Sequence, residues 1–132
     1  MLERYQATLE KDGSYIIHDV PIFAEITREV GFSDGSAETL NYDKVWIDTA
    51  VKEARRREGQ NGNIPTLFVE HNEGEGATKR EIAGFFRNQR SETVFMDGVP
   101  KRVVYADLVI TNPEVFAEIQ RGQFPGISVE IR

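Results

Sequence analysis

Short segments that alternate hydrophobic and polar residues run through most of the chain. Residues 2–9 and 14–23 mix β-branched and aromatic side chains and flank Lys11-Asp12-Gly13, a cluster that favours a turn. They predict a hairpin at the start of the chain. Asp97-Gly98 is a second hairpin signal, because both residue types tolerate the positive φ angles of a two-residue turn. Further strands are predicted at 66–71, 82–90, 93–96 and 102–111.

Two segments follow the period of a helix instead. From Asp43 the apolar residues recur at intervals of three to four, and arginines fill the last turns before Gly59. Basic residues at that end of a helix are favoured by its dipole and are typical of a solvated face. A second, short helix is predicted after Asn112, a good N-cap that is followed by Pro113, and Gly122 ends it.

The remaining segments are less regular. Between residues 24 and 40, glycines, serines and an aspartate interrupt every period, so we expect a long loop or an irregular cover. The tail 127–131 alternates apolar and polar residues, which predicts a strand with one buried face. Short strands with two helices predict an α+β fold, with a mostly antiparallel sheet or small β-barrel covered by two or more helices.

Composition narrows the classes of function. The 132 residues, with 39% hydrophobic side chains, are enough for one domain with a sizeable core and too few for two. Sixteen basic against 22 acidic residues leave a net charge of −6, so we do not expect nucleic acid as a partner. No apolar run approaches a membrane span, and the N-terminal residues lack the order of a signal peptide. The absence of cysteine excludes a thiolate nucleophile.

Two histidines are the candidates for acid–base chemistry near neutral pH. His71 ends an apolar strand, shares a face with Leu67 and Val69, and meets a glycine-bearing loop that could leave its ring edge open to solvent. The alternative is a strand-end histidine with a satisfied hydrogen bond. His18 ends the first hairpin, where Asp19 is only a local neighbour, and we interpret it as structural.

Ser128 is the candidate nucleophile. Ile127 and Val129 flank it and point to the other side of the predicted strand, so Ser128 shares its face with Gly126 and Glu130. A serine on the polar face of an edge strand is usually ordinary. The same placement can also present a nucleophile to a histidine on a neighbouring strand. The spacing alone leaves both interpretations open.

We expect no metal and no other cofactor. Glu70, His71, Glu73 and Glu75 form an acidic cluster, but one histidine with scattered carboxylates matches neither a zinc site nor a calcium loop. The loop Gly74-Glu75-Gly76 lacks the lysine and the strand–turn–helix setting of a phosphate-binding loop.

A resemblance to a known family covers close to the whole chain. Three blocks carry it: Val20-Pro21-Ile22-Phe23-Ala24; Ile64-Pro65-Thr66-Leu67-Phe68-Val69-Glu70-His71 followed by Ala83-Gly84-Phe85; and Ala106 to Glu114 followed by Phe124-Pro125-Gly126-Ile127-Ser128-Val129-Glu130-Ile131. In this order they resemble the prohead (capsid maturation) serine proteases of tailed phages. The resemblance is greatest to the phage Mu-type protease group, which is related in fold to the herpesvirus assemblin proteases.

The resemblance implies a serine endopeptidase in the host cytoplasm, inside the assembling prohead, with scaffold protein and major capsid protein as its substrates and a second copy of the chain as a further partner. His71 would be the general base and Ser128 the nucleophile. The resemblance also implies a herpesvirus-protease-like fold.

The sequence leaves two candidates for the third catalytic group. Assemblin relatives use a second histidine after the serine, and neither histidine of this chain matches it. Glu130, two residues beyond Ser128 on the same predicted face, is the first candidate, and Asp107 on a preceding strand is the second.

The domain prediction is a single protease-like unit, 1–132, with the nucleophile strand close to its end. Oxyanion-hole donors in the related fold come from chain beyond that strand. We therefore consider three cases: a fragment truncated after the nucleophile strand, a site completed by another chain, and a catalytically inactive phage structural or assembly protein with the same fold.

Overall fold

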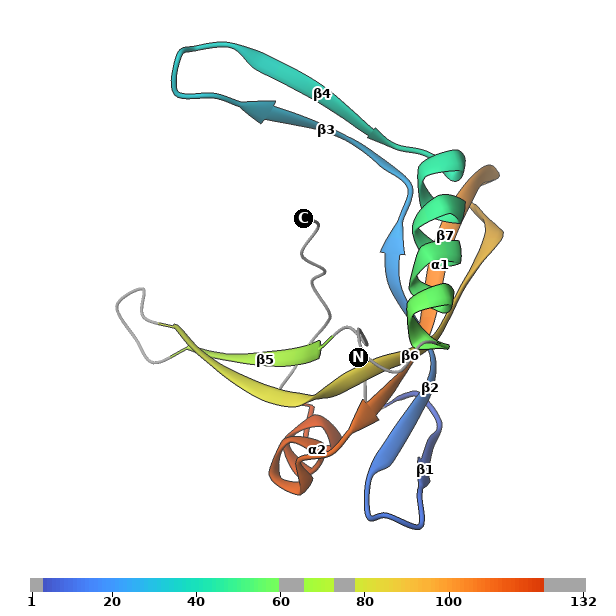
Figure 1. Ribbon diagram of the computed structural model, residues 1–132, viewed down its shortest axis with the longest axis vertical. Helices are drawn as coiled ribbons and strands as arrows, with labels where there is room; N and C mark the ends of the chain where they lie inside the picture. The colour runs from blue at the N-terminus through green and yellow to red at the C-terminus, as the bar shows by residue number, and fades with distance from the viewer. Residues whose placement is uncertain (1–3, 60–65, 73–77, 123–132) are drawn as a thin grey trace.

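The computed structural model describes residues 4–59, 66–72 and 78–122, and for residues 70–72, 78 and 79 it describes the backbone alone. Five strands form one antiparallel sheet in the order β1-β2-β7-β6-β5 (Figure 1). Their bounds are β1 Ala7–Leu9, β2 Tyr15–Ala24, β5 Thr66–Asn72, β6 Thr78–Met96 and β7 Val99–Ile110. The predicted first hairpin is therefore confirmed as β1 and β2.

A second, two-stranded sheet is made by β3 (Ile26–Gly31) and β4 (Ala37–Tyr42), which project from the main sheet as an arm (Figure 1). The loop predicted for residues 24–40 is therefore wrong. The residues that interrupt the period make the turn between the two strands: Gly35 has φ 86°, and the Ser36 backbone N–H donates to Asp34 Oδ1 at 2.9 Å. Periodicity alone did not separate a turn between strands from a long loop.

The long hairpin of β6 and β7 supplies two inner strands of the main sheet. The separate strands predicted at 82–90 and 93–96 form one continuous strand, β6, with an irregularity between Arg87 and Arg90. The turn at Asp97 and Gly98 has positive φ angles of 52° and 78°, which confirms the predicted two-residue hairpin.

Helix α1 (Lys44–Glu58) begins as predicted, because the Asp43 side chain accepts a hydrogen bond from the Trp46 backbone N–H at 2.9 Å. Its buried residues Ile47 and Val51 pack with Val104 of β7. This contact fixes α1 on the half of the long hairpin that is nearer to its turn.

Helix α2 (Pro113–Gln120) is capped by Asn112, whose side chain accepts from Glu114 N at 3.0 Å. Its residues Val115, Phe116 and Ile119 pack in the larger core cluster, which includes Leu108 and Ile110 of β7. Since Val104, Leu108 and Ile110 are separated by even numbers of positions along β7, the two helices cover successive stretches of one face of that strand.

The sheet is open, and the prediction of a small, herpesvirus-protease-like β-barrel is wrong for the described residues. Closure requires the two edge strands to pair, but β1 pairs with β2 alone and β5 with β6 alone. With only three residues, β1 offers too short an edge for a closing ladder. The predicted mostly antiparallel pairing is found throughout. Among the described helices, none is long and apolar enough to cross a membrane.

Candidate functional site

His71 lies near the end of β5, an edge strand of the main sheet. Its backbone pairs with Lys79 of β6, as expected for the strand predicted at 66–71. The other edge of β5 has no partner strand among the described residues. A further strand could therefore add beside His71.

Ser128 and Glu130 lie outside the described residues, so the predicted contact of His71 with Ser128 and Glu130 is not placed. Glu73 and Glu75 of the acidic cluster also lie outside them. In the part of the chain that is described, no three histidine, aspartate or glutamate side chains are grouped so that they could hold a metal ion.

The sheet register separates Asp107 from His71. Asp107 of β7 pairs with Arg87 of β6, whereas His71 of β5 pairs with Lys79 of β6. The two pairing positions on β6 are eight residues apart, or roughly 26 Å at about 3.3 Å per residue. Asp107 therefore does not orient the His71 ring within this sheet, which corrects the second candidate for the third catalytic group.

Asp107 is instead the centre of a buried polar junction. It is 8% exposed, and both neighbouring strands have a bulge at its level, between Ile17 and Val20 and between Arg87 and Arg90. Such bulges interrupt the ladder and redirect backbone groups. The backbone N–H of Asp19 therefore faces Asp107 from the bulge in β2, and the side chains of Asn88 and Arg90 face it from the bulge in β6.

Both carboxylate oxygens of Asp107 have partners within the junction. Asp107 Oδ1 accepts from the Asp19 backbone N–H at 3.1 Å, and Oδ2 accepts from Asn88 Nδ2 at 3.4 Å. Arg90 pairs with Asp19 and lies 3.7 Å from Asp107 Oδ1. Asp19 and Asn88 have φ angles of 56° and 57°, which these two residue types tolerate. The junction is thus a structural lock between β2, β7 and β6.

A surface depression of about 330 Å³ shares Asn88 with this junction and is also lined by Arg55, Glu58 and Gly59. Both carboxylate oxygens of Glu58 accept from the Asn88 backbone N–H, at 3.1 and 3.0 Å. This contact ties the end of α1 to the bulge in β6. These four residues include no hydroxyl and no imidazole, and both oxygens of the one carboxylate, Glu58, already accept from the Asn88 N–H.

A second polar network links α1 to the hairpin. Ser91 Oγ donates to Asp48 Oδ1 at 2.8 Å, and the Arg102 side chain donates to Asp48 at 2.8 Å and to Ser91 at 3.1 Å. The Arg102 hydrogen bond, followed by that of Ser91, holds the pKa of Asp48 below its ordinary value. A carboxylate with a lowered pKa is a poor base, so the network fits anchoring better than activation of Ser91.

His18, the other histidine, lies on β2. Its Nε2 is 2.8 Å from Thr8 Oγ1 on β1, so its ring links the two strands of the first hairpin. This placement agrees with the structural interpretation of His18.

Sequence reasoning missed the Asp107 junction and the Asp48 network. Asp19 and Asn88 are residue types that tolerate positive φ, which was the one available signal. A bulge, however, depends on what the partner strand presents, and that partner is distant in the sequence.

Comparison of the chain with family models, with curated proteins and with solved structures finds no match in any of the three.

Proposed function

We propose that the chain is a serine endopeptidase of the phage capsid-maturation type, acting on scaffold and capsid proteins inside an assembling prohead. The proposal rests on the resemblance of three sequence blocks to prohead proteases. The observation that carries it is the position of His71 on an edge strand, where a further strand could add. A strand formed by residues 127–131 is the candidate for that place, because Ser128 must reach the His71 ring.

In the proposed reaction His71 takes the proton of the Ser128 hydroxyl as Oγ attacks the scissile carbonyl. The bond to the leaving amine breaks, and the amine receives that proton from His71. Water then hydrolyses the acyl-enzyme and regenerates the Ser128 hydroxyl. Glu130 is proposed to orient the imidazole. No oxidant, reductant or cofactor is needed for these steps.

A fluorophosphonate probe tests the nucleophile without knowledge of the natural substrate. An activated serine Oγ displaces fluoride from the probe, and mass spectrometry then identifies the labelled peptide. We expect labelling at Ser128, no labelling of Ser128→Ala, and a labelling rate at least about 100-fold lower for His71→Ala. Glu130→Gln is expected to lower the rate at least about tenfold, as loss of an orienting carboxylate does.

Two matched controls are available in the chain. Ser33→Ala removes an exposed serine of the arm, and His18→Gln removes the other histidine, which contacts Thr8. Both should be labelled at the wild-type rate. Absence of labelling in the wild-type chain, or equal labelling of Ser128→Ala, would contradict the endopeptidase proposal.

The second candidate function is a catalytically inactive assembly protein. It is favoured by the exposure of large apolar side chains at the tip of the β6–β7 hairpin, where Phe95 is 75%, Met96 52% and Val99 52% exposed. Exposed apolar patches of this kind commonly mark contacts with other proteins. Lack of fluorophosphonate labelling would support this candidate over the first.

A further inference from the structure

The arm of β3 and β4 separates apolar from polar side chains. In its register Ile26 pairs with Tyr42, Arg28 with Leu40 and Val30 with Glu38. Because alternate residues of a strand share a face, these side chains lie together, and Phe32 continues the alternation beyond β3. We call this set the arm face: Ile26, Arg28, Val30, Phe32, Glu38, Leu40 and Tyr42. The opposite face is polar, with Thr27 donating to Asn41 at 3.1 Å.

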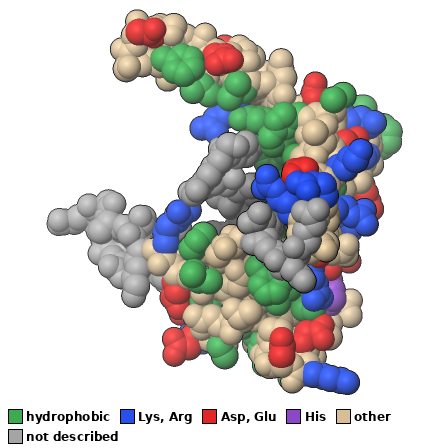
Figure 2. Space-filling model, viewed as in Figure 1, with side chains coloured by type: hydrophobic (Ala, Val, Ile, Leu, Met, Phe, Trp, Pro, Cys, Tyr) green, Lys and Arg blue, Asp and Glu red, His purple; other side chains and the backbone are tan. Residues whose placement is uncertain are grey.

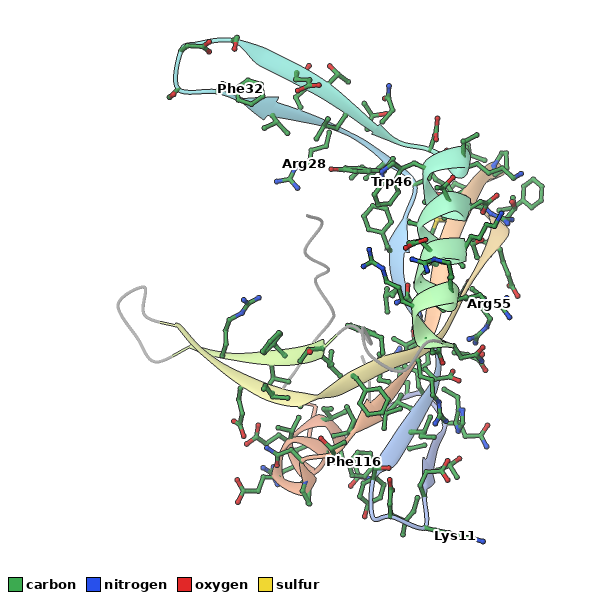
Figure 3. The ribbon with its side chains drawn as sticks, in the orientation of Figure 1. Lys11, Arg28, Phe32, Trp46, Arg55 and Phe116 are labelled. Atoms are coloured by element: carbon green, nitrogen blue, oxygen red, sulfur yellow. The ribbon has the colours of Figure 1, made fainter. Side chains whose placement is uncertain are left out.

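The arm face is open along most of its length. Ile26 is 52% and Phe32 49% exposed, and Figure 2 shows hydrophobic side chains uncovered on the arm. The arm is held at its root, where the Tyr42 ring packs on Trp46 of α1 with centroids 4.7 Å apart. In Figure 3 Phe32 lies near the tip of the arm, far from α1, and Arg28 lies nearer to the root, with its side chain directed away from α1. An isolated two-stranded hairpin is at best marginally stable, so an apolar face of this kind favours a second layer.

The charges on the arm face are self-complementary. It carries one cation, Arg28, and one anion, Glu38, at neighbouring positions of the register. Neither forms an ion pair within the described residues. When two such faces meet about a two-fold axis, Arg28 of each copy can oppose Glu38 of the other, and apolar side chains cover one another.

We propose that two copies of the chain associate through their arm faces, packed against each other about a two-fold axis. Each six-residue strand is about 20 Å long, and two paired strands are about 10 Å wide, so the area of the arm face is roughly 200 Å². This area is well below the about 800 Å² per partner of a stable complex. The association is therefore weak and concentration-dependent. The proposal does not depend on protease activity.

Sedimentation of the full chain over micromolar to millimolar concentrations tests the association. We expect a reversible monomer–dimer equilibrium. Replacing Ile26→Thr and Phe32→Thr together should lower the association constant at least tenfold, because threonine keeps strand propensity but removes apolar area. Phe95→Thr, at the tip of the other hairpin, is the matched control and should leave the constant unchanged. The fluorescence of Trp46, the only tryptophan, checks that each variant folds.

Charge exchange distinguishes arm-to-arm pairing from other contacts. Arg28→Glu leaves two negative charges on the face and Glu38→Arg leaves two positive charges, so each variant alone should associate more weakly than the wild type. An equimolar mixture of the two should associate again, and the chain with both changes should regain dimerisation. A wild-type chain that stays monomeric throughout, binding that survives the Ile26 and Phe32 changes, or a mixture no better than its components would overturn the proposal.

Discussion

At the scale of single residues, Gly84 is the glycine whose position has no room for a side chain. It lies in β6 opposite Ile110, and a Cβ atom there would lie 1.7 Å from the Val109 carbonyl oxygen and 2.8 Å from its carbon. The obstacle is backbone of the central strand, which no side-chain rotation relieves. The glycine in the block Ala83-Gly84-Phe85 is therefore explained by close strand approach, whatever the chemistry of the protein.

Gly84→Ala should lower the free energy of unfolding by about 3 kcal/mol or more, because β6 and β7 must move apart. Urea unfolding followed by Trp46 fluorescence measures the change. The control is Gly98→Ala, where φ is 78° but no atom lies within 4 Å of the added Cβ. Its cost should be about 1 kcal/mol, from backbone strain alone. Equal effects of the two substitutions would show that β6 and β7 separate easily at Gly84.

At the scale of elements, the attachment of α1 to the long hairpin combines apolar packing with one charged network. Ile47 and Val51 supply the packing, and Asp48, in the same turn as Ile47, joins Arg102 and Ser91. The Arg102 backbone is held as well, since its N–H donates to Glu25 Oε1 at 2.9 Å. The network therefore fixes the helix to two strands and to the root of the arm.

Asp48→Asn should weaken the attachment of α1 and so lower the free energy of unfolding near neutral pH. In acid the free energy of unfolding of this variant should be nearly equal to that of the wild type. The pKa of Asp48 in the folded chain lies below the ordinary 3.8, so its stabilisation is complete above pH 3.8 and is lost as pH falls through the lower folded value. With 36% of the Asp48 side chain exposed, we expect a difference of about 1 kcal/mol at pH 7.

Urea titrations between pH 7 and pH 3 measure this difference. A wild-type advantage over Asp48→Asn that persists unchanged at pH 3 would show that the carboxylate charge is not what anchors the helix.

At the scale of the whole molecule, stability is unequal between the sheet and the arm. Strand β7 is bonded on both sides, by β2 and β6, and its residues 106–110 are all buried. The strands of the arm bond only to each other and are mostly exposed. Local opening should therefore begin in the arm.

Hydrogen exchange of a dilute sample should show amides of residues 106–109 exchanging at least ~100-fold more slowly than those of residues 27–30, after correction for intrinsic rates. Equal protection of the two segments in dilute solution would contradict this order of stability. At millimolar concentration the arm amides should gain protection if arm faces associate, whereas those of β7 should change little.

The sequence predicted the parts of the fold that local chemistry decides. Local residues decide the Asp43 and Asn112 caps, the Asp97-Gly98 turn and the strand that carries His71. The loop predicted for 24–40 failed, because the same glycine and serine signals fit a turn between strands. Of the candidate catalytic residues, His71 is placed by its backbone, and Ser128 and Glu130 stay predictions.

Which strands are neighbours and which edges stay open became clear from the folded arrangement. Composition and periodicity are equally compatible with a closed barrel and an open sheet, because closure depends on pairing between the distant strands β1 and β5. The same non-local pairing placed Asp107 between two bulges and far from His71 along β6. Caps, turns and alternation can be predicted from the residues, because they act over a few positions, whereas register and burial are properties of the assembled sheet.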